Sequence, residues 1–85
     1  MLNEIKANLI KLGQLEEIAN HAEVDYEREP ENTEYEETFD RAYKAEFDLY
    51  IKLSRQIAIL AGISETTAKK MIQTKRNELI SILGI

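Results

Sequence analysis

Cysteine is absent from this chain of 85 residues, and glycine and proline together occupy only four positions. Without cysteine, neither a disulfide framework nor a thiolate metal site is available, which suits a reducing compartment. No apolar run approaches the roughly 18 residues of a membrane-spanning helix, and the N-terminus lacks the basic-then-apolar order of a signal peptide. We therefore expect a soluble, cytoplasmic protein that does not enter a membrane.

Residues that commonly carry catalysis or bind metals are also scarce. His21 is the only histidine, and although Glu17 and Asp25 lie one helical turn from it, the Glu-x-x-His spacing of di-metal helical bundles is missing. The three glycines are scattered, so no phosphate-binding loop is formed, and no carboxylate pair lies in an apolar stretch that would shift its pKa. We expect no enzymatic activity, no bound metal and no cofactor.

The sequence is rich in helical periodicity. Between residues 33 and 61 an apolar stripe recurs every third or fourth residue, with no glycine or proline to interrupt it. We expect one long helix whose aromatic side chains face the smaller aliphatic residues of a neighbouring helix and form the core. The stripe consists of Tyr35, Phe39, Tyr43, Phe47, Tyr50, Leu53, Ile57 and Leu60.

The first helix should occupy residues 3–28, which show the same periodicity, with Asn3 as its N-terminal cap. Pro30 disfavours helical geometry at the preceding residue and therefore ends this helix. Thr33 and Glu36 have the spacing of a capping box, which would start the long helix over residues 33–61.

The third helix is expected over residues 64–83. Gly62 should end the long helix in a left-handed conformation, Ser64 should cap the next one, and Gly84 should close it. Two helices of similar length joined by a short linker predict an antiparallel hairpin. The sequence thus predicts an all-α fold, in which the hairpin and the third helix form a three-helix bundle and a single domain over residues 1–85.

Aliphatic residues near the C-terminus exceed what a three-helix monomer readily buries. One of them, Ile59, lies opposite the main stripe of the long helix, and further isoleucines follow in the third helix. We expect these residues to form a self-association surface and the protein to be a homo-oligomer. They are Ile59, Ile80, Ile82 and Ile85.

The formal net charge of −5 conceals a strong asymmetry. Residues 1–50 contain 14 acidic and 5 basic residues, whereas residues 51–85 contain 2 acidic and 6 basic ones. Acidic residues crowd around the expected hairpin turn, where they offer a docking surface for a basic protein partner or form a solvated tip that keeps the protein soluble. The candidate partner-binding residues are Glu27, Glu29, Glu31, Glu34, Glu36 and Glu37.

A second motif lies in segment 57–72, which has Ala58 shortly before a turn, Gly62 within it and Ser64 at the start of the following helix. This arrangement resembles the helix-turn-helix of bacterial repressors, in which exposed residues of the second helix contact bases or phosphates. The resemblance implies that DNA is contacted by Thr66, Thr67, Lys69, Lys70 and Gln73.

Our interpretation is a non-catalytic helical interaction protein, of adaptor or inhibitor type. It would present its acidic hairpin tip to a basic protein partner and self-associate through its C-terminal region. The alternative is a small DNA-binding regulator that uses residues 57–72, so that nucleic acid would take the place of the protein partner.

Overall fold

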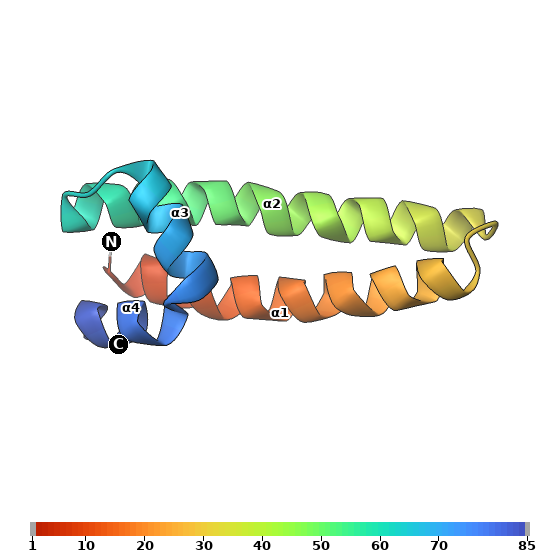
Figure 1. Cartoon of the computed structure of the whole chain (residues 1–85), viewed down its shortest axis with the longest axis horizontal. Coiled ribbons are helices and arrows are strands. Elements are labelled where there is room, and N and C mark those ends of the chain that lie inside the picture. The colour runs from red at the N-terminus through yellow and green to blue at the C-terminus, as the bar shows by residue number, and fades with distance from the viewer. Residues whose placement is uncertain (1, 85) are drawn as a thin grey trace.

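The computed structural model describes residues 2–84, apart from the side chain of Ile82, and this range contains four helices and no strand. The helices are α1 (Leu2–Arg28), α2 (Thr33–Ala61), α3 (Glu65–Thr74) and α4 (Arg76–Leu83). In Figure 1 the two long helices α1 and α2 run antiparallel, and they pack closely in a molecule of 45 × 20 × 19 Å. The predicted all-α class is confirmed.

The prediction of one third helix over residues 64–83 is wrong, because the chain bends at Lys75 and divides this region into α3 and α4. Lys75 has φ −133° and ψ 39°, outside helical geometry. Side chains donate to carbonyl groups next to the bend: the Thr74 hydroxyl donates to the Lys70 carbonyl at 2.8 Å, and Arg76 Nε donates to the Ile72 carbonyl at 3.2 Å. Such local hydrogen bonds compete with the helical pattern.

The predicted capping box at the start of α2 is also wrong. Asn32, not Thr33, is the N-cap, and its side-chain oxygen accepts from the backbone N–H groups of Glu34 at 3.0 Å and Tyr35 at 3.4 Å. Asparagine is among the strongest N-caps, so it takes this role when it lies one residue earlier. Similarly, α1 already includes Asn3, since it begins at Leu2.

The corner between α2 and α3 follows the prediction. Gly62 ends α2 with φ 67°, in the left-handed region where a side chain is disfavoured. The Ser64 side chain then caps α3 by accepting from the backbone N–H of Thr67 at 3.1 Å. These two caps fix the sharp reversal that carries α3 back across the hairpin (Figure 1).

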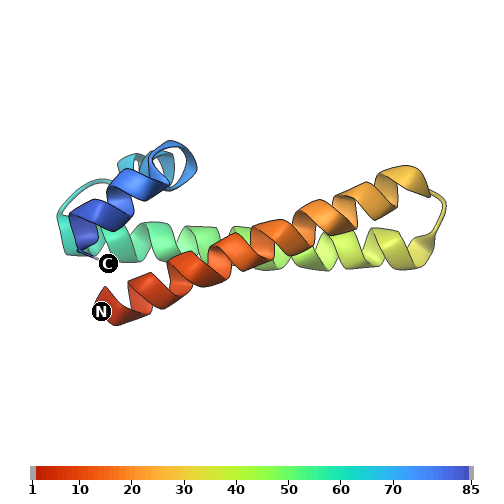
Figure 2. The same ribbon diagram turned by 90° about the horizontal axis from the view of Figure 1, so that it is seen from below.

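The main core lies at one end of the hairpin and draws on all four helices. There α3 and α4 cover the N-terminal part of α1 and the C-terminal part of α2 (Figure 2). A single polar residue, Ser54, is buried in the described core, and its hydroxyl donates to the Tyr50 carbonyl at 2.7 Å. The cluster comprises Ile5, Leu9, Leu12, Leu53, Ile57, Ala58, Ala68, Ile72 and Leu79.

The other half of the hairpin, residues 13–47, is called the distal half below. No third layer covers its outer part in either view (Figures 1 and 2). Its buried core is a small cluster of alanines, Ala19 and Ala22 from α1 and Ala42 from α2, with Phe39 packed against it. Two helices joined by so small a core depend largely on the main core for their stability.

The prediction that the whole aromatic stripe forms the core is wrong for Tyr43 and Phe47, whose residues are 60% and 51% exposed. The buried alanines are small, and Phe39 is the ring that packs against them. Tyr26 and Phe39 meet edge to face with centroids 5.7 Å apart, and Phe39 and Tyr43 do so at 6.2 Å. The distal half therefore exposes two rings of α2, Tyr43 and Phe47, which are called the aromatic row below.

Candidate functional site

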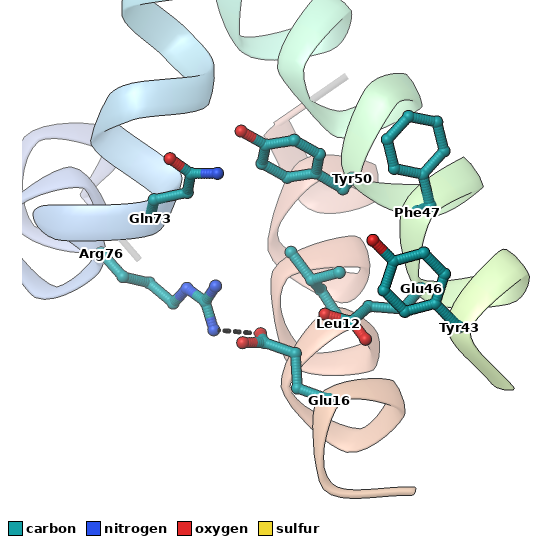
Figure 3. Close-up of a pocket in the computed structure, with 8 residues that line it drawn as sticks. All are labelled: Leu12, Glu16, Tyr43, Glu46, Phe47, Tyr50, Gln73 and Arg76. Carbon is teal, nitrogen blue, oxygen red and sulfur yellow. Dashed lines mark hydrogen bonds and ion pairs between the residues drawn. The ribbon is translucent and has the colours of Figure 1, made fainter. Parts of the chain in front are cut away.

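A cleft of about 340 Å³ lies where the α3–α4 bend meets the hairpin (Figure 3). Three rings of α2 form one side, and the rest of the lining is polar apart from Leu12. Concave sites with apolar walls and a few polar groups are the usual form of a binding site. The residues that line it are Leu12, Glu16, Tyr43, Glu46, Phe47, Tyr50, Gln73 and Arg76.

An ion pair between α1 and α4 forms the polar floor. Arg76 Nη1 donates to the carboxylate of Glu16, and the two side chains are only about one-third exposed. The Arg76 guanidinium is further held by its hydrogen bond to the Ile72 carbonyl. Because a partly buried arginine–carboxylate contact is charge-assisted and directional, it fixes both side chains in the cleft.

Glu46 is the second carboxylate of the cleft, and it has a different environment. Partial burial raises the pKa of Glu46, and the nearby charge of Glu16 raises it further, while Arg76 acts in the opposite direction. In the described part of the chain Glu46 takes part in no ion pair. The cleft therefore contains two carboxylates and one guanidinium, and that guanidinium is already paired with Glu16.

Tyr50 connects the aromatic side of the cleft to α3. Its hydroxyl donates to the Lys69 carbonyl at 3.3 Å, which holds the ring between α2 and α3. Burial raises the pKa of the Tyr50 phenol, an effect that Gln73 partly opposes, so the hydroxyl remains a donor at neutral pH. Tyr50 is thus a fixed part of the wall, whereas Tyr43 and Phe47 present their rings to solvent.

The six glutamates predicted to bind a partner are all exposed and lie around the hairpin turn, at the end of the molecule opposite α4 (Figure 1). The ion pair found near the turn joins Arg28 and Asp25 at 3.0 Å and does not involve them. Their charges are therefore presented to solvent, and the structure places them away from the cleft rather than within it.

Two of the residues predicted for self-association have described side chains, Ile59 and Ile80. Ile59 is 72% exposed on α2. Ile80, on α4, is half-buried against the main core and lines a separate apolar groove of about 240 Å³ together with Leu9, Ile10 and Lys6. Ile85 and the side chain of Ile82 lie outside the described residues.

The residues implied by the helix-turn-helix resemblance all lie on α3, and four of the five are exposed: Thr66, Thr67, Lys70 and Gln73. Their environments differ, however. The Thr67 hydroxyl accepts a hydrogen bond from Ser64 at 2.9 Å as part of the cap, and Gln73 lines the cleft. The preceding helix, α2, continues unbroken over 29 residues, whereas the motif has a short first helix.

Sequence reasoning did not identify the cleft or its polar residues. Glu16, Glu46 and Arg76 come from three different helices, and no spacing in the sequence connects them. One signal was available for the exposed rings. The first helix offers alanine at buried positions 19 and 22, which indicates a narrow distal core rather than one that accepts large aromatic residues.

Among residues 2–84, no group of three or more histidine, cysteine or carboxylate side chains is arranged to hold a metal ion, and His21 is exposed. Over the same described range, no helix combines the length and the apolar character needed to cross a bilayer. Comparison of the chain with protein families, with characterised proteins and with solved structures found no significant match.

Proposed function

We propose that the protein is a non-catalytic helical interaction module that binds a basic segment of a protein partner along the distal half of its hairpin. The observation that carries this proposal is the exposure of Tyr43 and Phe47 on α2, which lie beside the α3–α4 bend and are more than half exposed. The described structure supports this role through the apolar surface and the charge of the distal half.

The apolar surface consists of two exposed rings on α2, those of Tyr43 and Phe47. Aromatic residues are enriched in protein interfaces, where they bury a large area at a low cost in side-chain entropy. A partner that covers the aromatic row would supply the layer that this half of the hairpin lacks.

The charge of the distal half indicates the chemistry of the partner. Residues 13–47 contain twelve acidic and three basic residues, whereas the rest of the chain has four acidic and eight basic ones. An acidic surface accelerates the approach of basic partners and disfavours acidic ones. The exposed glutamates of the tip add to this field without being neutralised by the Arg28–Asp25 pair.

Binding of matched synthetic peptides tests this proposal. Labelled peptides with alternating leucine and arginine should bind more tightly than equally long peptides with alternating leucine and glutamate, and added salt should weaken that binding. Replacing Glu34, Glu36 and Glu37 with glutamine should reduce the affinity several-fold, since each removes a negative charge facing the peptide.

The matched control removes three negative charges outside the distal half, by Glu4→Gln, Asp48→Asn and Glu78→Gln. It should leave most of the affinity in place. Equal binding of the arginine and glutamate peptides, or equal loss in the tip and control variants, would show that the distal half is not a docking surface for basic segments.

We further propose self-association as a second property of the same module. The support is apolar surface away from the distal half: the groove lined by Leu9, Ile10 and Ile80, and the exposed side chain of Ile59. Both lie at the basic end of the molecule, so copies joined there would leave their acidic halves free for a partner.

DNA binding is the rival proposal, supported by the Ser64 cap and by the exposed Thr66 and Lys70 on α3. It predicts binding to duplex DNA whose logarithm falls linearly with the logarithm of salt concentration, with a shallower slope after Lys70→Ala. Absence of duplex binding at low salt would eliminate it.

A further inference from the structure

We propose that the cleft at the α3–α4 bend is an anchor site for one arginine side chain, stacked on Tyr43 and Phe47 with its guanidinium directed at Glu46. This inference rests on the proposed function, because it identifies which side chain of the basic segment binds in the cleft. It assigns the cleft a ligand of defined chemistry, a planar cation carried by a peptide.

The aromatic side of the cleft has the spacing that a planar cation requires. Tyr43, Phe47 and Tyr50 follow one another at four- and three-residue intervals on α2, so successive rings lie on one face, one turn apart. Two of them are more than half exposed and therefore accessible. A guanidinium over such rings is attracted by their quadrupoles and also stacks on them.

The charges of the cleft select a cation. The negative charge of Glu16 is already neutralised by Arg76, which is held by two hydrogen bonds. Glu46 has no such partner among the described residues, so the cleft has one excess negative charge. An anion would be repelled by the unpaired carboxylate of Glu46, and an uncharged apolar group would cover Glu46 without compensating its charge.

The environment of Glu46 agrees with this assignment. Partial burial and the charge of Glu16 raise the pKa of Glu46, which means that its ionised form is less favourable than that of a carboxylate in water. A guanidinium beside it would stabilise the ionised form. Arginine fits better than lysine, because only the guanidinium combines flat stacking with paired donors toward a carboxylate.

The anchor is tested with two short peptides, glycine–arginine–glycine and glycine–citrulline–glycine, both blocked at their termini. Citrulline has nearly the same shape as arginine but no charge. Titration into isotopically labelled protein should shift NMR resonances of Tyr43, Glu46 and Phe47 with the arginine peptide and not with the citrulline peptide. Glu46→Gln and Phe47→Ala should each weaken the arginine peptide at least about threefold.

Asp48→Asn is the matched control for Glu46→Gln. It removes the same charge from the same helix, but Asp48 is exposed and does not line the cleft, so the affinity should change little. Equal binding of the two peptides, or shifts concentrated at the tip glutamates instead of the cleft, would overturn the anchor.

The long arginine–leucine peptides separate this inference from the proposed function. If the variant with Glu34, Glu36 and Glu37 replaced binds them weakly but Glu46→Gln binds them normally, the anchor is overturned and the docking surface stands. If the short arginine peptide occupies the cleft while the long peptides show no preference for basic charge, the proposed function fails by itself.

Discussion

Glu46 and Glu16 lie in one cleft, and their carboxylates differ in what stabilises their charge. Glu16 is paired with the Arg76 guanidinium, whereas Glu46 is partly buried and repelled by Glu16, and the attraction of Arg76 offsets these effects only in part. A carboxylate in the second situation opposes folding when it ionises, so its contribution to stability depends on pH.

We predict that Glu46→Gln stabilises the protein at neutral pH and not at acidic pH. Because the pKa of Glu46 is raised in the folded state, that state binds more protons than the unfolded chain between the two pKa values. Stability is therefore lost as pH rises through this window, starting from the unfolded pKa of about 4.3. Thermal unfolding of both proteins between about pH 3 and pH 7 measures the difference. A melting-temperature difference that is the same at all pH values would contradict this assignment.

Individual residues were predictable where local chemistry alone decides their role. Gly62 and Ser64 act as predicted because a left-handed C-cap and an N-cap depend on the residue itself. The start of α2 was predicted correctly, but its N-cap was assigned one residue late, since Asn32 and Thr33 are both good caps and their order in the sequence does not rank them. The Glu16–Arg76 pair was not predictable, because it depends on how three helices meet.

Among the helices, two glycines in different backbone conformations allow a paired test. Gly62 has φ 67° and Gly13 lies inside α1, and an added Cβ would meet no atom within 4 Å at either position. Since an added Cβ has room at both positions, the backbone conformation decides the effect of the substitution. Gly62→Ala should destabilise the protein by about 1 kcal/mol, because alanine is strained in the left-handed region.

Gly13→Ala should have the opposite sign and stabilise the protein by about 1 kcal/mol, since alanine is the better residue inside a helix. Urea unfolding of the two variants and the wild type measures both values. If both substitutions change stability in the same direction, backbone conformation is not what distinguishes the sites. The open space around Gly13 also shows that this glycine is a tolerated weak position and not a close helix crossing.

The two long helices should differ in stability along their own lengths. The part of α1 around Leu9 and Leu12 is covered by the main core, whereas the part around Ala19 and Ala22 packs only against α2. We predict that native-state hydrogen exchange is faster in the distal half of both helices than in the covered half, because less apolar surface must be exposed to open it. Equal protection along α1 would mean that something else stabilises the distal half.

The extents of α1 and α2 were predictable because a long periodic stripe and a proline-containing linker define them. The bend at Lys75 was not, because neither glycine nor proline marks it, and threonine and arginine also occur inside helices without the carbonyl contacts found here. The bend also brings Arg76 to the cleft, so the missed break and the missed site have one cause.

For the whole molecule, the proposed self-association has a direct test. We predict that light scattering at tens of micromolar protein gives a mass above that of one chain, and that Ile10→Lys or Ile59→Lys lowers it. Both side chains are more than half exposed, at 57% and 72%, so a lysine there adds charge to a contact surface without disturbing the core. Tip variants should leave the mass unchanged. A wild-type protein that stays monomeric under these conditions would eliminate the proposal.

The sequence therefore predicted the fold class and the hairpin, and it located the charge at the hairpin turn. It did not predict how much of the hairpin α3 and α4 would cover. The covered length depends on the bend after α3. Apolar residues beyond it remain exposed, among them Tyr43 and Phe47. Which apolar residues stay exposed depends on how all the helices pack together, so the periodicity of one helix does not predict it.

The position of the main core also has a consequence for how the protein is made. Ile5 and Leu79 belong to the same cluster although they lie near opposite ends of the sequence. During synthesis the hairpin can form early from local contacts, but the cluster stays open until α4 has left the ribosome. Until then the newly synthesised hairpin would expose the apolar residues that α3 and α4 later cover. A chain released before Leu79 is added would expose them permanently.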